Sequence, residues 1–280
     1  MRCAWQEYIS ILPPWMRQAV DDLGKDTLLE LRLRINYPPE LVTLTGSICL
    51  ERRMISDDLC YIVNAASQYS PWATETVSRC YITASGGHRI GICGEAITKF
   101  GEMVGIRSPT SLCVRVARDY PGIAKSIPMD RGSILIIGKP GSGKTTLLRD
   151  LIRQYACYID SAVGVVDERG ELFPVVRGSS CFPTGSKTDI ITGCSKKDGI
   201  LSLIRTMGPG CVAVDEITQQ EDSEALIHAG WCGVNLLATA HAFDRHDLFS
   251  RSIYAPLLNA KLFSTLLIMQ KDKSWKAERL

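Results

Sequence analysis

The sequence predicts an α/β protein, in which a C-terminal domain built on a parallel sheet follows a smaller α+β domain. Two observations carry this prediction. A glycine-rich segment, Gly138 to Thr146, stands between an apolar run and a helix-like pattern. Around it, short apolar runs alternate with helical stretches, at about 133–137, 163–166, 211–214, 234–239 and 264–269. Strands that alternate with helices form parallel sheets covered on both faces.

The composition is that of a globular protein with room for two domains. The chain has 280 residues, 45% hydrophobic and 22% charged, with a net charge of +2 that gives no general reason to expect nucleic-acid binding. Its eleven cysteines show no CxxC or zinc-finger spacing, so we expect reduced thiols in the cytoplasm. No signal-peptide pattern and no apolar run of membrane-spanning length is visible, so work at a membrane requires recruitment.

Residues 1–118 are predicted to form the N-terminal domain. Amphipathic spacing indicates short helices up to about residue 35, although the segment 28–35 is compatible with either a helix or a strand. A hairpin about Gly46, a helix from Ser56 to about Ser67 and glycine-punctuated strands over 89–106 follow. No catalytic motif stands in this part of the chain.

The second predicted domain, 119–280, contains the spacing GxxxxGKT. Glycines at 138, 141 and 143 let backbone N–H groups curl round a phosphate without obstruction by a Cβ atom. Lys144 is placed to reach the β- and γ-phosphates, and Thr145 to bind Mg²⁺. We therefore predict that ATP and Mg²⁺ bind here, since no NKxD-type motif for guanine follows. The predicted nucleotide-binding residues of the loop are Gly138, Lys139, Pro140, Gly141, Ser142, Gly143, Lys144, Thr145 and Thr146.

The ends of the later strands supply polar side chains. The run CVAVDE delivers Asp215, predicted to hold Mg²⁺ through its water shell, and Glu216, predicted to polarise an attacking water. Glu168, after the strand at 163–166, is expected to assist at the metal or the water. If the strand at 234–239 lies between the phosphate-loop strand and the CVAV strand, His241 or Thr239 stands opposite the γ-phosphate as a sensor. The alternative for His241 is a packed core histidine.

Two further segments carry charge. Arg107, Arg115 and Arg118 are either solvated side chains on a strand edge or include one that reaches the nucleotide across a domain or subunit boundary. The segment 173–197, rich in glycine, serine, proline and threonine, is expected to be a long exposed loop that carries Lys187, Lys196 and Lys197.

Four segments, GKPGSGKTTLLRDLIR, VVDERGEL, GILSLIRTMGPGCVAVDEI and GVNLLATAHA, resemble in order and spacing the family of stage III sporulation protein AA, relatives of the type II and type IV secretion-system ATPases. By position, 138–145 matches the Walker A loop, 167–171 the acidic box, Asp215 and Glu216 the Walker B pair, and His241 the histidine box. The three arginines match more loosely. The resemblance implies a RecA-like P-loop ATPase domain and a homo-hexameric ring.

The resemblance also implies a place of action. Such a ring lies in the cytoplasm and is recruited to membrane-embedded sporulation channel proteins on the mother-cell face of the forespore envelope. The resulting hypothesis is an oligomeric ATPase that hydrolyses ATP to energise a secretion-like channel complex during engulfment. The alternative is a nucleic-acid-dependent P-loop ATPase. Because no terminal basic cluster or aromatic-basic interleaving occurs, we do not expect nucleic acid as a partner.

Overall fold

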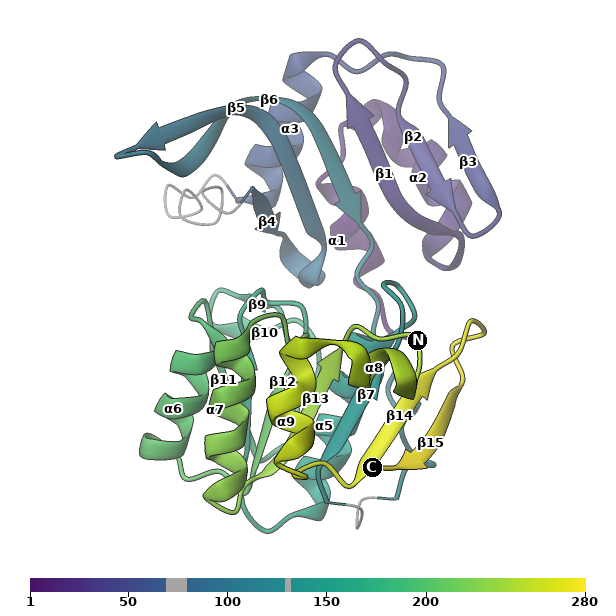
Figure 1. The fold of residues 1–280 in the computed structure, drawn as a ribbon. Coiled ribbons are helices and arrows are strands. Elements are labelled where there is room, and N and C mark those ends of the chain that lie inside the picture. The colour runs from purple at the N-terminus through teal and green to yellow at the C-terminus, as the bar shows by residue number, and fades with distance from the viewer. Residues whose placement is uncertain (69–79, 129–131) are drawn as a thin grey trace. The chain divides into compact units, whose positions relative to one another are not determined.

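The computed structural model describes residues 1–68, 80–128 and 132–280, drawn in Figure 1. The chain divides into two compact units. Unit 1 comprises Met1–Asp119 and Pro174–Phe182, and unit 2 comprises Tyr120–Phe173 and Pro183–Leu280. Among the described residues, no helix combines the length and the apolar character that crossing a bilayer requires.

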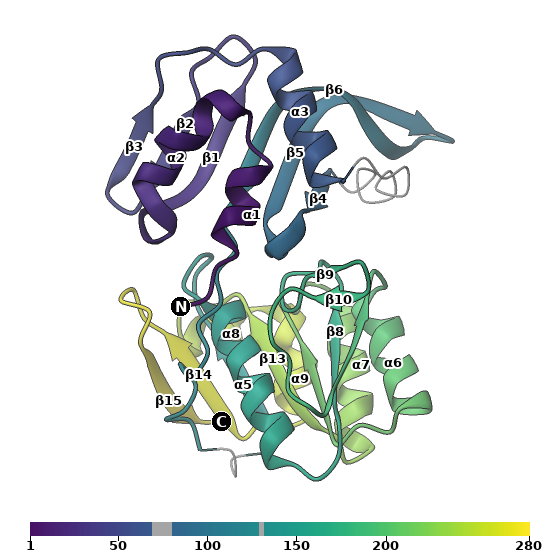
Figure 2. The same cartoon turned by 180° about the vertical axis from the view of Figure 1, so that it is seen from behind.

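Unit 1 is an antiparallel sheet with helices on one face. Its six strands run in the order β3-β2-β1-β6-β5-β4, and every neighbouring pair is antiparallel. Figure 2 shows the helices in front of these strands. The elements are α1 (Trp5–Ser10), α2 (Pro14–Thr27), β1 (Leu28–Arg34), β2 (Glu40–Thr43), β3 (Gly46–Cys49), α3 (Ser56–Ala66), β4 (Tyr81–Thr83), the short 3-10 helix η2 (Ser85–Gly87), β5 (Arg89–Lys99) and β6 (Glu102–Arg115), together with the two-stranded hairpin β9 (Val175–Val176) and β10 (Ser179–Ser180).

The segment that the pattern left open between helix and strand is the strand β1. It pairs with β2 on one side and β6 on the other. Leu31 and Leu33 are fully buried in the core of unit 1, while Arg32 and Arg34 point to the other face. This period of two is what a sheet with one covered face requires. Gly24, with φ +74°, interrupts α2 near its C-terminal end, shortly before the strand begins at Leu28.

Unit 2 is a seven-stranded sheet in the order β11-β8-β12-β13-β7-β14-β15. All neighbouring pairs are parallel except β14 and β15. The elements are β7 (Ile134–Ile137), α5 (Lys144–Tyr158), β8 (Val163–Asp167), β11 (Thr188–Thr192), α6 (Lys196–Thr206), β12 (Cys211–Val214), α7 (Gln220–Trp231), β13 (Asn235–Ala240), α8 (Arg245–Ser250), the 3-10 helix η4 (Ser252–Tyr254), α9 (Ala255–Asn259), β14 (Thr265–Met269) and β15 (Trp275–Arg279).

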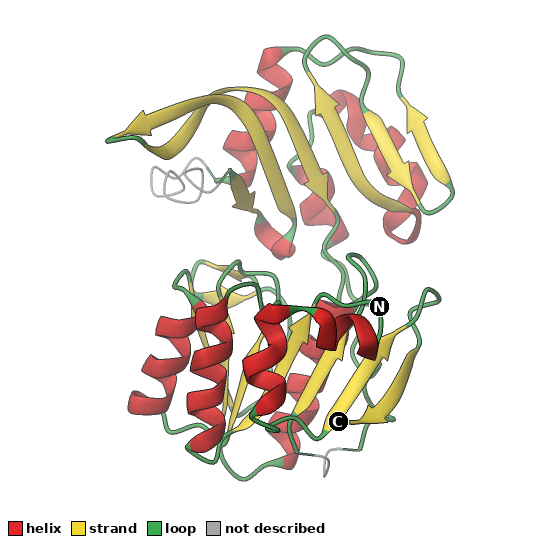
Figure 3. Cartoon of the chain, viewed as in Figure 1, coloured by secondary structure: helices red, strands yellow, loops and turns green. Residues whose placement is uncertain are grey.

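Helices cover both faces of this sheet. Helix α5 lies on the face turned to the viewer in Figure 2, and α6, α7 and α9 lie on the face seen in Figure 3. The strands β7, β8, β12 and β14 are buried at every position, as continuous apolar runs predict. The five predicted strands are all present, and β13 lies between β7 and β12, which is the arrangement that the sensor hypothesis for His241 or Thr239 requires. The α/β fold class is therefore confirmed.

The prediction of one long exposed loop over 173–197 is wrong in part. This segment contains the hairpin of β9 and β10, the edge strand β11 paired in parallel with β8, and the start of α6 at Lys196. Strand β11 escapes detection because an edge strand is only half buried, so Thr188–Thr192 has just two consecutive apolar residues.

Candidate active site

The loop between β7 and α5 has the backbone shape that its glycines predict. Gly141 and Gly143 adopt φ +74° and +99°, values that residues with a Cβ atom rarely take. At Gly138 a Cβ atom would lie 2.6 Å from Ser142 Oγ and 2.7 Å from Met269 Cβ. The loop leads into the N-terminus of α5, whose first N–H groups have no partner within the helix. This end of a helix attracts anions.

Lys144, the first residue of α5, points back into the loop. Its Nζ donates to the carbonyl oxygens of Gly138 at 2.9 Å and Lys139 at 3.1 Å, and lies 3.2 Å from His241 Nδ1. Burial lowers the pKa of Lys144, while the carboxylates of Asp215 and Glu216 act in the opposite sense. The ammonium is thus held by neutral acceptors that a phosphate oxygen can replace.

Asp215 is held from two sides by hydroxyl groups. Thr145 Oγ1 donates to Oδ2 at 2.8 Å, and Thr239 Oγ1 donates to Oδ1 at 2.6 Å. Burial raises the pKa of Asp215, which these two hydrogen bonds partly oppose. The Thr239 hydroxyl also accepts the backbone N–H of Glu216 at 2.7 Å. The fully buried Thr239 hydroxyl thus links the carboxylate of Asp215 to the backbone of Glu216.

Glu216 and His241 complete a chain of contacts to Lys144. His241 Nε2 lies 2.7 Å from Glu216 Oε1. Since an ammonium only donates, Nδ1 of His241 accepts from Lys144, and Nε2–H therefore donates to Glu216. Glu216 has φ +50°, a left-handed conformation that costs a non-glycine residue about 1–2 kcal/mol. Strained residues of this kind concentrate at functional sites.

A small pocket adjoins the acidic pair. Glu168, at the end of β8, contacts Lys196 there, with Nζ donating to Oε2 at 2.6 Å. Asp167 holds the loop that follows β8, because its carboxylate accepts the backbone N–H groups of Glu171, Leu172 and Phe173. Burial raises the pKa of Asp167, and these backbone bonds oppose the shift. The pocket is lined by Asp167, Glu168, Arg169, Glu171, Lys196, Asp215 and Glu216.

The three predicted arginines belong to unit 1 and have partners there. Arg107 pairs with Glu95, and Arg115 Nε lies 3.2 Å from Glu30 Oε2. Arg118 donates to the backbone carbonyls of Lys25 and Leu28. The structure thus brings Lys144, Thr145, Asp215, Glu216 and His241 together in unit 2, with Glu168 beside them in the pocket, and it gives each arginine a contact within unit 1.

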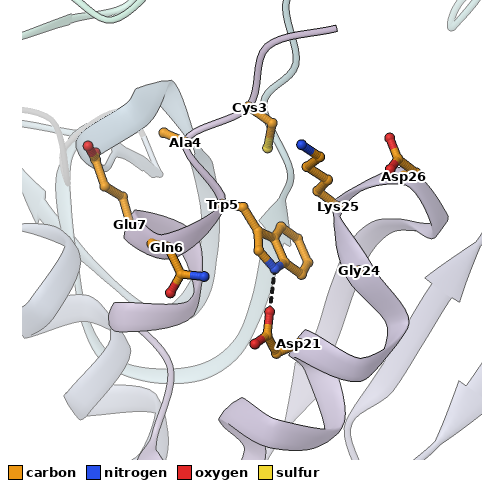
Figure 4. Close-up of a pocket in the computed structure, with 9 residues that line it drawn as sticks. All are labelled: Cys3, Ala4, Trp5, Gln6, Glu7, Asp21, Gly24, Lys25 and Asp26. Carbon is orange, nitrogen blue, oxygen red and sulfur yellow. Dashed lines mark hydrogen bonds between the residues drawn. The ribbon is translucent and has the colours of Figure 1, made fainter.

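Unit 1 has a hollow of its own, of about 630 Å³ and shown in Figure 4. It lies between the start of α1 and the end of α2, and none of the predicted site residues lines it. In Figure 4 the indole of Trp5 stands at its centre, with Nε1–H donating to Asp21 Oδ1 at 2.6 Å.

Three observations fit a magnesium-bound triphosphate in unit 2. Ser142 Oγ, inside the loop, is buried without a hydrogen-bond partner. The hydroxyl of Thr145 and the carboxylate of Asp215, both oxygen ligands of the kind Mg²⁺ prefers, are 2.8 Å apart. The buried Lys144 ammonium lies at the same helix end. The residues present therefore suit this group.

Comparison with known families decides where the chain belongs. A family model described as sporulation stage III, protein AA, matches residues 6–277. The chain belongs to this family. It is also 33% identical to stage III sporulation protein AA of Bacillus subtilis (strain 168), over 95% of this chain and 91% of that protein. The predicted family is thereby confirmed.

Solved structures with the same fold include a pilus retraction motor and an ATPase. The pilus retraction motor PilT with bound ADP aligns with a TM-score of 0.62 at 14% identity, over 90% of this chain and 76% of that one. The ATPase DotB of Legionella pneumophila aligns with a TM-score of 0.56 at 16% identity, over 96% and 80%. At these identities the likeness shows the fold, which is the RecA-like P-loop fold.

Sequence reasoning missed Lys196, which it placed in an exposed loop. The signal was present: Ser195 and Asp198 form a helix-capping pair, in which Ser195 Oγ accepts the N–H of Asp198. A helix that starts there places positions 196, 199, 200 and 203 on one face, and all four are buried. The loop-like composition before Ser195 hid this start.

Proposed function

We propose that this protein is an oligomeric ATPase that hydrolyses ATP with Mg²⁺ in unit 2 and acts on a membrane channel complex during endospore formation. The observation that carries the proposal is the contact chain Lys144–His241–Glu216, set at the N-terminus of α5 beside Asp215. It joins a phosphate-binding ammonium to a carboxylate through one imidazole. The family and the fold likeness support the same class of function.

Each residue has a role in this proposal. The backbone N–H groups of 141–146 and the ammonium of Lys144 bind the phosphates. The buried Ser142 hydroxyl, which has no hydrogen-bond partner in the part of the chain described, donates to a phosphate oxygen. Thr145 and Asp215 hold Mg²⁺, which neutralises phosphate charge when bound. Glu216 orients the attacking water and accepts its proton. Glu168 assists at that water from the pocket wall.

His241 senses whether a γ-phosphate is bound. Its ring contacts Lys144 through Nδ1 and Glu216 through Nε2. A γ-phosphate competes for the Lys144 ammonium, so its arrival and departure change the hydrogen bond at Nδ1. The change reaches Glu216 through the same ring, which couples phosphate occupancy to the carboxylate that handles water.

The finer features follow the resemblance and are part of the proposal. We propose domains at 1–118 and 119–280, which the compactness of the two units supports. The protein assembles as a homo-hexamer in the cytoplasm and is recruited to membrane-embedded channel proteins on the mother-cell face of the forespore envelope at engulfment. One of Arg107, Arg115 and Arg118 then stabilises phosphate charge across a subunit boundary.

The test is phosphate release from ATP with Mg²⁺ by the full chain and its Glu216→Gln variant. We expect the variant to bind ATP like the parent but to turn over at least about a hundredfold more slowly, because the general base is lost. Binding is measured with a fluorescent ATP analogue in the same preparations. Turnover of the variant equal to that of an active parent contradicts the role of Glu216, and a parent that neither binds nor hydrolyses ATP contradicts the proposed function.

A further inference from the structure

Lys196 is a buried cation without a role in the proposed ATPase mechanism. Only 4% of the residue is exposed, although it lies in the first turn of α6, where the helix dipole disfavours positive charge. Burying an ammonium is costly unless anionic partners compensate. The partners of Lys196 therefore explain why a lysine stands here.

Two carboxylates face the ammonium from two other elements. Glu168 Oε2, just past β8, accepts from Nζ at 2.6 Å, and Asp222 Oδ2, in the first turn of α7, lies at 3.5 Å. Asp222 also caps the N-terminus of α7, since its Oδ2 accepts the backbone N–H of Thr218 at 2.9 Å and of Gln219 at 3.2 Å, both just before the helix. The shorter, charge-assisted contact is the one to Glu168.

The surroundings of Glu168 show what this contact does. Besides Glu168, the pocket is lined by four more acidic residues, Asp167, Glu171, Asp215 and Glu216, and by two basic ones, Arg169 and Lys196. Carboxylates outnumber basic groups in this lining, and their mutual repulsion favours rotamers that turn Glu168 away. The side chain of Glu168 is 36% exposed, so it has room to turn towards solvent. A fixed ammonium opposes both tendencies.

We infer that Lys196 is a positioning residue of the ATPase site: it holds Glu168 in the pocket that Asp215 and Glu216 also line. The inference rests on the proposed function, because the role of Glu168 is part of it. Lys196 acts through Glu168 and makes no contact with substrate in this account.

The experiment compares Lys196→Met with Lys197→Met in the full chain. Lys197 is the next residue on the same turn but is exposed, so its variant controls for loss of one lysine from α6. We expect Lys196→Met to lower kcat for ATP at least about tenfold, with KM and binding of a fluorescent ATP analogue within about threefold of the parent, since a positioned group near water is lost. Lys197→Met should match the parent, and Lys196→Arg should restore part of kcat.

A double variant separates positioning from general support of the fold. Because Lys196 acts through Glu168, adding Lys196→Met to Glu168→Gln should lower kcat no further than Glu168→Gln alone. Asp222→Asn keeps an oxygen for the N–H groups of 218 and 219 but removes the charge that faces Lys196. We expect it to lower the melting temperature and leave kcat within about threefold of the parent.

The outcomes distinguish the two proposals. The positioning role is overturned if Lys196→Met has the kcat of the parent. It is also overturned if Lys196→Met lowers kcat further when added to Glu168→Gln. In both cases an active parent leaves the ATPase proposal standing. A loss of kcat in Asp222→Asn as large as in Lys196→Met also overturns the positioning role, because the effect then runs through α7. A parent without ATP turnover overturns the proposed function and this inference together.

Discussion

The buried histidine of unit 1 and the polar site residues of unit 2 have different hydrogen-bond partners. In unit 1, fully buried His88 bonds to backbone on both sides: Nε2 lies 2.9 Å from the carbonyl oxygen of Ala4, and Nδ1 accepts the N–H of Ala117 at 3.1 Å. In unit 2, the predicted site residues Lys144 and Asp215 and the buried Thr239 also bond to other side chains of the site. Bonds to backbone fasten a fold, whereas bonds among side chains at a helix N-terminus can be exchanged for bonds to a ligand.

The sheets of the two units also differ in where their polar side chains lie. The antiparallel sheet of unit 1 pairs its outward charges with one another, for example Arg32 with Glu30 at 2.6 Å. The parallel sheet of unit 2 gathers its polar residues where β7, β8, β12 and β13 end, the edge at which such sheets bind ligands. Since the proposed chemistry lies in unit 2, we expect substitutions in the two units to affect different measurements.

The largest expected effect on this comparison comes from Thr239→Val. Valine fills the same space but removes the hydroxyl that joins Asp215 Oδ1 to the N–H of Glu216. A buried donor and a buried acceptor without partners cost about 1–3 kcal/mol each, so we expect about 3 kcal/mol of lost stability. The acidic pair also loses its orientation, and kcat should fall at least about tenfold. Chemical denaturation and phosphate release measure the two effects.

Thr188→Val is the matched control. Thr188 Oγ1 in the edge strand β11 is buried without a hydrogen-bond partner, so its removal costs little or stabilises. We expect unchanged turnover and equal or higher stability. If Thr239→Val resembles Thr188→Val in both measurements, the hydroxyl bridge does not orient the site.

A smaller effect is expected in unit 1 on acidification. Burial lowers the pKa of His88 from 6.5 to about 4, with the hydrogen bond to Ala4 acting in the opposite sense. The unfolded chain therefore binds the proton first, and stability falls as the pH drops below about 6.5 and levels off near 4. At about 1.36 kcal/mol per pH unit, the loss between pH 7 and pH 5 is about 2 kcal/mol.

Hydrogen exchange of the β1 and β6 amides at pH 7 and pH 5, corrected for intrinsic exchange, reports this loss locally. In His88→Gln, which does not titrate in this range, unit 1 should be less stable at pH 7 but should depend less on pH. An equal pH dependence in parent and variant assigns the acid sensitivity to other groups.

Much of unit 2 was predictable because its signals are local. Continuous apolar runs mark buried parallel strands. Among the loop glycines, Gly138 marks a position where a Cβ atom would clash, and Gly141 and Gly143 mark positive φ. What stayed hidden depends on tertiary partners. The segment 28–35 becomes a strand because β2 and β6 pair with it, and β11 is an edge strand with one neighbour.

The site residues likewise fall into those that local sequence signals predict and those that depend on tertiary partners. Lys144, Thr145, Asp215 and Glu216 follow from motif spacing, and the place of His241 follows from the strand order. The bridging function of Thr239 and the burial of Lys196 do not, because each depends on an atom supplied by a different element: Asp215 at the end of β12, and Glu168 at the end of β8.

The central claim is that unit 2 clamps ATP through Lys144 at the N-terminus of α5. Equilibrium binding of ATP with Mg²⁺ to the parent and to Lys144→Ala tests it most directly. Lys187→Ala is the control, since Lys187 donates to the carbonyls of Ile159 and Asp160 and is none of the predicted site residues. We predict that Lys144→Ala weakens binding at least about a hundredfold, as expected for loss of a desolvated charge pair, while Lys187→Ala binds like the parent. Equal affinity of Lys144→Ala and the parent contradicts the claim.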